Sequence, residues 1–336
     1  MRVVVLGSSG LLGRSVTDEL LARGHEVVGV SRSGAATPAL AATGRVVRAD
    51  LSTASDAALD ALLDGAAAAV HCLGPDDRAP LPLPVERTLA EQLVGTTRRV
   101  AAAAGRRGLG HLVVLGSYFT AFDRLHPDWG LTRHPYVAAR RAQAEQARAA
   151  AGRTAVSVLE IPFVFGHVAG TQSVLKDLYL DRLRRGPVGI ALAGGTAAVA
   201  NTDVARAAAA VVEGWAGPGP LPLAVDNLTY RRLSGIVLDE LGRRVPVVVL
   251  PGPVVTLGAV ALDLTYRLRG RGTGLLARHA ARDLLARRLY LDPAEHAVPL
   301  GLVPRSLDGA VRETVRGSYP QLQGRGAAAS RAHSNR

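Results

Sequence analysis

The chain has 336 residues, 48% hydrophobic and 20% charged, which is enough for one large domain or two unequal ones. Its formal net charge is +12, but aromatic residues make up only 4% of the chain and no basic cluster alternates with them, which argues against nucleic-acid binding. Lys176 is the only lysine, so almost all of the positive charge is arginine. Cys72 is the only cysteine, which excludes an internal disulfide.

The first residues lead directly into four apolar residues, Val3 to Leu6, too few for the core of a signal peptide, and we expect a cytoplasmic protein. Residues 245–262 contain no charge and nearly reach the length of a membrane span. Pro251-Gly252-Pro253 interrupts this stretch, so we predict a strand ending at Leu250 and a helix starting near Val254, with no membrane span.

Strands and helices alternate through the first half of the chain. The predicted strands are 2–6, 26–30, 45–48, 67–71, 111–115 and 155–159, and the predicted helices are 11–23, 55–63, 85–104 and 136–151. This alternation predicts an α/β fold, a Rossmann doubly wound parallel sheet with helices on both faces.

The alternation ends after about Pro162, where glycine and proline become frequent. We expect helices at 175–184, 203–213 and 230–241, strands at 221–225 and 245–250, and an arginine-rich amphipathic helix at 274–291. The charged face of the last helix is either solvated or a contact for an anionic surface. The predicted organisation is a nucleotide-binding domain over 1–165, a smaller mixed substrate subdomain over 166–316 and a disordered polar tail over 317–336.

A glycine-rich turn joins the first strand to the first helix. Gly7 permits the tight turn, Gly10 allows close approach of a pyrophosphate, and Gly13 lets the helix pack on the strand. The helix N-terminus adds free N–H groups and a partial positive charge. This spacing predicts dinucleotide binding, and the alternative is an ordinary glycine-rich turn.

The residues after the second strand bear on the choice of cofactor. An acidic residue there would bind the ribose hydroxyls of NAD, but the sequence reads Ser31-Arg32-Ser33. Arg32, helped by the two serines, can hold a 2′-phosphate, and Arg14 could add a second charge. We therefore favour NADP(H), with NAD(H) possible, against the alternative that Arg32 is a solvated loop residue.

Three polar residues form a candidate catalytic set. Tyr136 and Arg140 are one helical turn apart, so they share a helix face. A cation beside a phenol stabilises the phenolate, and Tyr136 could then exchange a proton with a carbonyl or alcohol. Ser117 follows the fifth strand, at the edge of the sheet where ligands bind, and could hold the substrate oxygen. The alternative is a surface pair without a function.

Aromatic and imidazole side chains gather in the loop 118–135 and after the sixth strand, and they predict a largely apolar pocket for a small-molecule substrate. The expected pocket residues are Tyr118, Phe119, His126, Trp129, Phe163 and Phe165. Each could instead fill the core, and Tyr118 is an alternative proton donor. We expect no metal site, because no two histidines have ligand spacing on one element.

Together these motifs resemble the extended short-chain dehydrogenase/reductase family, which includes NAD(P)-dependent epimerases, dehydratases and dihydroflavonol-reductase-like enzymes. The resemblance covers residues 1 to about 310 and includes Gly116-Ser117, Tyr136-x-x-x-Arg140 and Asn201-Thr202-Asp203-Val204-Ala205. It implies further cofactor contacts by Ser9, Leu11, Leu12, Asp50, Leu51, Cys72, Leu73, Gly74, Tyr136, Arg140 and Pro162.

The resemblance implies an NADP(H)-dependent oxidoreductase that moves a hydride between the nicotinamide and a carbonyl or secondary alcohol. Tyr136 would exchange the proton, Arg140 would position the ribose, and Ser117 would hold the oxygen. Arg140 stands where the family has lysine, and Gln92 near where it often has asparagine. The alternatives are an epimerase, dehydratase or isomerase that recycles its cofactor, or a non-redox cofactor-binding protein. A homodimer through helices 85–104 and 136–151 is also implied.

Overall fold

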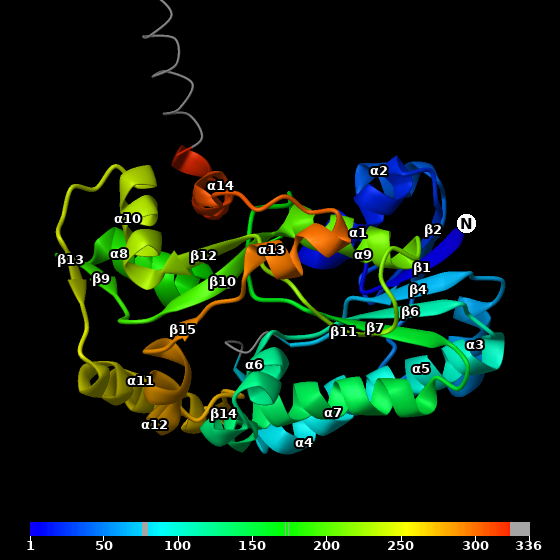
Figure 1. Cartoon of the computed structure of the whole chain (residues 1–336), viewed down its shortest axis with the longest axis horizontal. Coiled ribbons are helices and arrows are strands. Elements are labelled where there is room, and N and C mark those ends of the chain that lie inside the picture. The colour runs from blue at the N-terminus through cyan, green and yellow to red at the C-terminus, as the bar shows by residue number, and fades with distance from the viewer. Residues whose placement is uncertain (76–79, 172, 174, 323–336) are drawn as a thin grey trace, which may run out of the picture.

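A seven-stranded parallel sheet forms the centre of the protein, in the order β11-β7-β6-β4-β1-β2-β3 (Figure 1). The computed structural model describes residues 1–75, 80–171, 173 and 175–322. The strands are β1 (Arg2–Leu6), β2 (Glu26–Ser31), β3 (Val46–Arg48), β4 (Ala68–His71), β6 (His111–Leu115), β7 (Ala155–Glu160) and β11 (Gly219–Pro222). The predicted α/β doubly wound fold is confirmed.

Helices cover both faces of this sheet because both faces of its strands are apolar. On β1, Val3 and Val5 belong to one buried cluster, and Val4 and Leu6 to another. One face is covered by α1 (Leu11–Ala22) and α9 (Asn201–Val212), and the other by α3 (Asp56–Leu63), α5 (Thr96–Arg107) and α7 (Pro135–Ala150) (Figure 1). Continuous apolar strands of this kind are typical of a sheet buried on both sides.

A second, smaller sheet is built from the later part of the chain. It has the order β12-β10-β15, and β8 also pairs with β10. The strands are β8 (Phe163–Phe165), β10 (Gly195–Ala200), β12 (Asp226–Thr229) and β15 (Arg288–Leu289). The remaining elements before residue 252 are α2 (Pro38–Ala42), α4 (Val85–Leu89), α6 (Phe119–Leu125), α8 (Asp181–Arg185), α10 (Tyr230–Glu240), β5 (Leu81–Pro82), β9 (Gly189–Ala191) and β13 (Val247–Val249).

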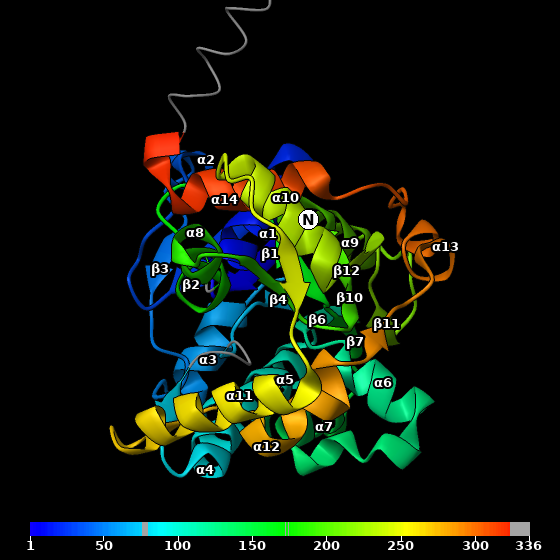
Figure 2. The ribbon, with the colours of Figure 1, turned by 90° about the vertical axis from the view of Figure 1, so that its left-hand side faces the viewer.

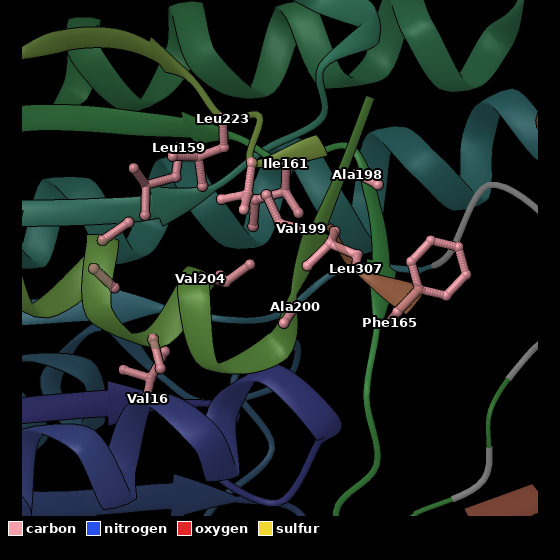
Figure 3. Close-up of a cluster of buried hydrophobic side chains, with 14 of the residues drawn as sticks. Val16, Leu159, Ile161, Phe165, Ala198, Val199, Ala200, Val204, Leu223 and Leu307 are labelled. Atoms are coloured by element: carbon pink, nitrogen blue, oxygen red, sulfur yellow. The ribbon is translucent and has the colours of Figure 1, made fainter. Parts of the chain in front are cut away.

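The two sheets share one hydrophobic core, so the boundary expected at residue 165 does not separate two layers. Figure 3 shows Leu159 of β7 and Ile161, which follows that strand, beside Val199 of β10 and Val204 of α9. Moreover, β11 and α9 come from the second half of the chain but complete the first sheet and its cover. The second half is therefore interleaved with the first.

The expected helix over 274–291 is wrong. The helical part is α12 (Ala277–Ala280) with a π-helical turn at Ala281–Leu285, and the chain then extends into β15. There Leu289 pairs with Thr196 of β10 and is almost completely buried. Pairing with a strand far away in the sequence overrides the local helical pattern, which periodicity alone does not reveal.

The segment 118–135 is also more regular than the predicted loop. It contains α6 and two 3-10 turns, Pro127–Trp129 and Leu131–Arg133. Phe119 and Phe122 point into the core, so burial of aromatic side chains organises this segment.

The uncharged stretch 245–262 forms a strand and a helix, as expected. β13 pairs with β9, and after Pro251 the chain forms α11 (Gly252–Arg267). Among the described residues, no helix has both the length and the hydropathy needed to cross a membrane.

The C-terminal part continues through β14 (Arg271–Gly272), α12, α13 (Pro293–His296) and α14 (Asp308–Ser318), and α14 packs on α10. A 3-10 turn follows at Pro320–Leu322, so the chain is still helical beyond Gly317, where the tail was expected to begin. The rest of that predicted tail, residues 323–336, lies outside the described residues.

The start of α9 depends on a buried carboxylate. Asp203 is fully buried, accepts the N–H of Ala200 at 2.9 Å, and accepts two hydrogen bonds from Nη2 of Arg305 at 2.8 and 2.9 Å. Two residues earlier, the amide of Asn201 donates to Ser15 of α1 at 2.9 Å. The Asn201–Ala205 motif thus caps α9 and joins it to α1.

We predict that Asp203→Ala lowers the free energy of unfolding by about 1–3 kcal/mol, because it removes the cap and the buried carboxylate that pairs with the exposed Arg305. Denaturant titration measures this change. The matched control is Asp308→Ala, which breaks an exposed ion pair with Arg232 and should cost less than about 1 kcal/mol. Equal losses in the two variants would contradict the prediction.

Candidate active site

A cavity of about 530 Å³ lies where β1, β4, β6 and β7 end. This is the edge of a doubly wound sheet at which ligands bind. The predicted residues that line it are Ser9, Gly10, Leu11, Leu12, Gly13, Cys72, Leu73, Gly74, Ser117, Tyr118, Phe119, Tyr136, Arg140, Pro162 and Phe163. The fold therefore brings the glycine turn and the candidate catalytic residues to one cavity.

The glycine turn has the geometry of a phosphate cradle. Gly7 has a φ of +92°, and a Cβ on Gly13 would lie 2.1 Å from the carbonyl oxygen of Gly7, so both positions require glycine. Gly10 is exposed and lines the cavity, with the Gly7 carbonyl oxygen as the nearest atom at 3.7 Å from a Cβ built there. No side chain of the described chain caps α1, so its first N–H groups are available to a diphosphate.

Arg140 is hydrogen-bonded to Tyr136, the candidate proton donor. Its Nε donates to the Tyr136 hydroxyl at 3.0 Å. Its Nη1 donates to the carbonyl oxygen of Leu115 at 3.1 Å and to Oε1 of Gln143 at 2.9 Å, and its Nη2 donates to the carbonyl oxygen of Pro75 at 3.2 Å. The side chain thus connects the end of β6 and the segment after β4 to α7.

Among the described residues these bonds use four of the five guanidinium N–H groups, and the second N–H of Nη2 has no partner there. The side chain is buried, and no carboxylate within residues 1–75, 80–171, 173 and 175–322 forms an ion pair with it. A buried cation whose partners are neutral favours negative charge nearby. Arg140 can therefore stabilise an oxyanion on Tyr136.

Gly74 makes room for the guanidinium. A Cβ at this position would lie 3.0 Å from Nη2 and 3.1 Å from Nη1 of Arg140. The Arg140 side chain is held further by Gln143, whose amide donates to Thr97 of α5 at 3.0 Å. Sequence reasoning missed both supports: Gln143 is one turn from Arg140 and could have been found from its spacing, whereas Thr97 is brought near only by the fold.

Ser117 and Tyr118 differ in their surroundings. Ser117 is buried just after β6, and within the described part of the chain its hydroxyl accepts one long hydrogen bond, at 3.4 Å, from the N–H of Phe119. The Tyr118 hydroxyl lies 2.9 Å from the hydroxyl of Thr196 on β10. Tyr118 is therefore engaged with the second sheet, although it also lines the cavity.

The later part of the chain holds the N-terminus of α7. The N–H of Tyr136 donates to the carbonyl oxygen of Gly274 at 2.9 Å. His134 lies two residues before Tyr136. Its Nδ1 accepts a hydrogen bond from the N–H of Leu276 at 3.0 Å, and its Nε2 lies 3.3 Å from Oδ2 of Asp283. Burial lowers the pKa of His134. A neutral His134 with Nε2–H toward Asp283 satisfies both contacts and fixes the start of α7.

Three expected pocket residues do not line the cavity. His126 and Trp129 stack on each other with ring centroids 4.0 Å apart, and Arg287 lies over the Trp129 ring at 3.8 Å. Phe165 is almost completely buried in the shared core (Figure 3). Packing with neighbouring side chains, rather than a ligand, accounts for their positions.

The residues expected at the adenosine end lie outside the cavity lining, at the ends of β2 and β3. Ser31 and Ser33 accept hydrogen bonds from backbone N–H groups, whereas the side chain of Arg32 is exposed. Hydrogen bonds from Ser52, with a smaller contribution from the charge of Arg32, lower the pKa of Asp50. Leu51 is buried in the core.

Two other side chains are placed differently from their expected roles. Arg14 donates to the carbonyl oxygens of Ser9 at 3.0 Å and Ala169 at 2.8 Å, so it holds the glycine turn against the segment after β8. That segment adds Gly170, Thr171, Ser173 and Leu175 to the cavity lining, without a clear signal in the sequence. Gln92 is exposed in a π-helical turn and does not line the cavity.

A buried histidine lies beside this site. His71, the last residue of β4, is almost completely buried, and neither ring nitrogen has a hydrogen-bond partner among the described residues. Loss of hydration, with a smaller contribution from the charge of Arg140, lowers the pKa of His71 from 6.5 to about 4. His71 is therefore neutral in the folded protein at neutral pH.

We predict that His71 makes stability depend on pH. The unfolded chain binds a proton near pH 6.5 but the folded one only near pH 4, so stability is lost as the pH falls through this window. Between about pH 7 and 5 the loss is about 2 kcal/mol. His71→Leu should remove this part of the pH dependence, as measured by urea unfolding at both pH values. An unchanged slope would assign it to other groups.

The comparisons with known proteins concern the N-terminal half of the chain and the overall fold. Residues 7–156 match a family model described as NAD(P)H-binding. A dTDP-6-deoxy-L-talose 4-dehydrogenase (NAD(P)(+)) of Kitasatospora kifunensis is 48% identical over 63 residues, 19% of either chain. The matched segments span only 8% to 19% of the length of the curated relatives.

Solved structures cover nearly the whole chain. The structure named gox2253 has a TM-score of 0.72 at 18% identity and covers 94% of this chain and 97% of its own. A nucleoside-diphosphate-sugar epimerase from Pseudomonas aeruginosa has a TM-score of 0.65 at 18% identity, with 94% and 97% covered.

The doubly wound sheet and the glycine turn together define a protein of the Rossmann fold class. More specifically, residues 7–156 are similar to an NAD(P)H-binding family, and over nearly its whole length the chain shares its fold with a nucleoside-diphosphate-sugar epimerase.

Proposed function

We propose that this protein is an NADP(H)-dependent oxidoreductase that acts on a carbonyl or secondary alcohol of a small organic molecule. The observation that carries the proposal is the bonded pair of Tyr136 and Arg140, at 3.0 Å, in the cavity that also contains the glycine turn and Ser117. A proton-transfer group beside a dinucleotide site is what carbonyl reduction requires.

The residues fit such a cofactor. The glycine turn would hold the diphosphate, because Gly10 opens to the cavity and the first N–H groups of α1 are uncapped within the described chain. The remaining N–H of Arg140 would bind a ribose hydroxyl. The exposed side chain of Arg32 would pair with a 2′-phosphate. When bound, the cofactor supplies or accepts the hydride.

The chain's own residues handle the proton. In reduction, the Tyr136 hydroxyl gives its proton to the substrate oxygen as the carbonyl carbon gains a hydride, and in oxidation it takes the proton back. Arg140 stabilises the tyrosinate by its charge and by the Nε hydrogen bond. The Ser117 hydroxyl donates to the same substrate oxygen. Leu115, Ile161 and Phe163 line the cavity and exclude water.

An epimerase that recycles its cofactor is the second candidate, because the fold is shared with a nucleoside-diphosphate-sugar epimerase. It would show no net consumption of NADPH, whereas the proposed oxidoreductase consumes one NADPH for each carbonyl reduced. A homodimer through α5 and α7 is a further part of the proposal.

We predict that Tyr136→Phe lowers kcat by at least about 100-fold, because the proton donor is lost while the ring is kept. NADPH oxidation is measured with a panel of small ketones and aldehydes. Tyr118→Phe is the matched control and should stay within a few-fold of the wild type, since the Tyr118 hydroxyl lies against Thr196. The reverse result would assign the proton transfer to Tyr118.

We also predict that Arg32→Ala lowers kcat/KM for NADPH by about 10- to 100-fold and leaves the value for NADH nearly unchanged, because only NADPH has the 2′-phosphate. Arg45→Ala is the control at an exposed arginine that pairs with Glu26. An equal loss with both cofactors would exclude Arg32 as the phosphate partner.

A further inference from the structure

The helix α11 turns its apolar side toward solvent. None of its 16 residues is buried. Large apolar side chains recur every three or four residues on the solvent-facing side of the helix, and each is 42% to 80% exposed. They are Val254, Leu257, Val260 and Leu264, together with Leu268 directly after the helix. The one acidic residue of the helix, Asp263, is half-buried and accepts from Nε of Arg267 at 2.7 Å. A helix with this pattern normally has its apolar side covered.

The exposed apolar area extends beyond α11. Val248 and Val249 of β13 precede the helix and are exposed, and Leu83, whose N–H donates to the carbonyl oxygen of Gly270, lies near its other end. We call these eight residues the α11 surface: Leu83, Val248, Val249, Val254, Leu257, Val260, Leu264 and Leu268. They are eight of the 13 large hydrophobic side chains exposed in the described chain, so exposure of this kind is concentrated here.

A groove of about 600 Å³ deepens this surface. It runs between α11 and the segment after α12, and it is lined by Gly252, Pro253, Thr256, Leu257, Val260, Ala281, Arg282 and Ala286. Figure 1 shows α11 at one end of the long axis of the molecule, and Figure 2 shows it lying across the side that faces the viewer. The helix is therefore accessible to a large, flat partner.

The charges around the α11 surface are positive. Residues 251–290 contain seven arginines and two aspartates. One aspartate is paired within α11, and the other, Asp283, is buried. Arg269, Arg271, Arg278 and Arg282 are exposed, and Arg269 and Arg278 form no ion pair within the described part of the chain. The apolar surface thus has a cationic rim.

The combination of an apolar surface and a cationic rim favours one kind of binding partner over another. A second copy that bound through this same surface would bring its arginine rim against that of the first, so like charges would oppose this contact. An anionic bilayer offers both an apolar layer for the Val and Leu side chains and acidic headgroups for the arginines. With 16 residues, α11 can lie in the interface but cannot cross it.

We propose that the α11 surface docks on a membrane that contains anionic phospholipids, with the helix parallel to the bilayer. The apolar side chains enter the boundary between headgroups and acyl chains, and the exposed arginines pair with phosphates. This inference goes beyond the proposed function and does not depend on it, since the α11 surface and the catalytic cavity have no lining residue in common.

The test is co-sedimentation of the full chain with vesicles of phosphatidylglycerol and phosphatidylcholine, and with vesicles of phosphatidylcholine alone. The wild type should bind the anionic vesicles at least about tenfold more tightly than the neutral ones. Raising the ionic strength from about 0.1 M to 1 M shortens the Debye length from about 10 to 3 Å and should weaken binding markedly.

The double variant Leu257→Asp/Leu264→Asp should lose at least about tenfold in affinity, because it removes two apolar anchors and adds two negative charges. The matched control Val298→Asp/Val303→Asp changes two exposed valines outside the α11 surface and should bind like the wild type. Arg269→Gln/Arg278→Gln should weaken binding to anionic vesicles only. Far-UV circular dichroism and the thermal midpoint check that each variant is folded.

The proposal is overturned if the folded wild type does not bind anionic vesicles at low salt, or if the Leu257/Leu264 variant binds as well as its control. It is also overturned if the wild type binds no vesicles but sediments as a dimer that the Leu257/Leu264 variant dissociates. That result would make a second copy the occupant.

Discussion

The buried guanidinium of Arg140 is the constraint around which the site is arranged. It donates to the Tyr136 hydroxyl, to the carbonyl oxygen of Leu115 at the end of β6 and to that of Pro75 in the segment after β4. A planar group with donors in fixed directions can join a tyrosine hydroxyl to two segments at the sheet edge at once, which an ammonium on a flexible stem does less well. The position of Tyr136 relative to the sheet edge therefore depends on Arg140.

Other features of the site follow from accommodating this group. Glycine at position 74 leaves the space that the guanidinium occupies, and Gln143 with Thr97 supplies a buried polar partner. Because the hydrogen bonds of Arg140 satisfy nearly all its donors, the charge is held in place without a carboxylate from the described chain. Arg140, at the position where the resemblance places a lysine, thus has an environment that matches its guanidinium.

The second half of the chain contributes both to the central sheet and to the position of α7. It contributes β11 and α9 to the first sheet, and the carbonyl of Gly274 fixes the start of α7. The same half also carries α11, whose uncovered apolar side and arginine rim have no part in the cavity. The residues that hold the start of α7 and the residues of the exposed apolar surface therefore come from different stretches of one C-terminal half.

The sequence by itself determined the local features: the glycine turn between the first strand and helix, the parallel alternation through β7, and the shared helix face of Tyr136 and Arg140. Each of these features depends on residues only a few positions apart, so the hydrophobic periodicity and the glycine positions in the sequence reveal it directly. Only the tertiary structure decided that residues 288–289 form a strand, that Phe165 fills the core, that His126 and Trp129 stack away from the cavity, and that Thr97 supports Arg140. Each of these depends on contacts between residues far apart in the chain, and the free energy of such contacts outweighs local preference.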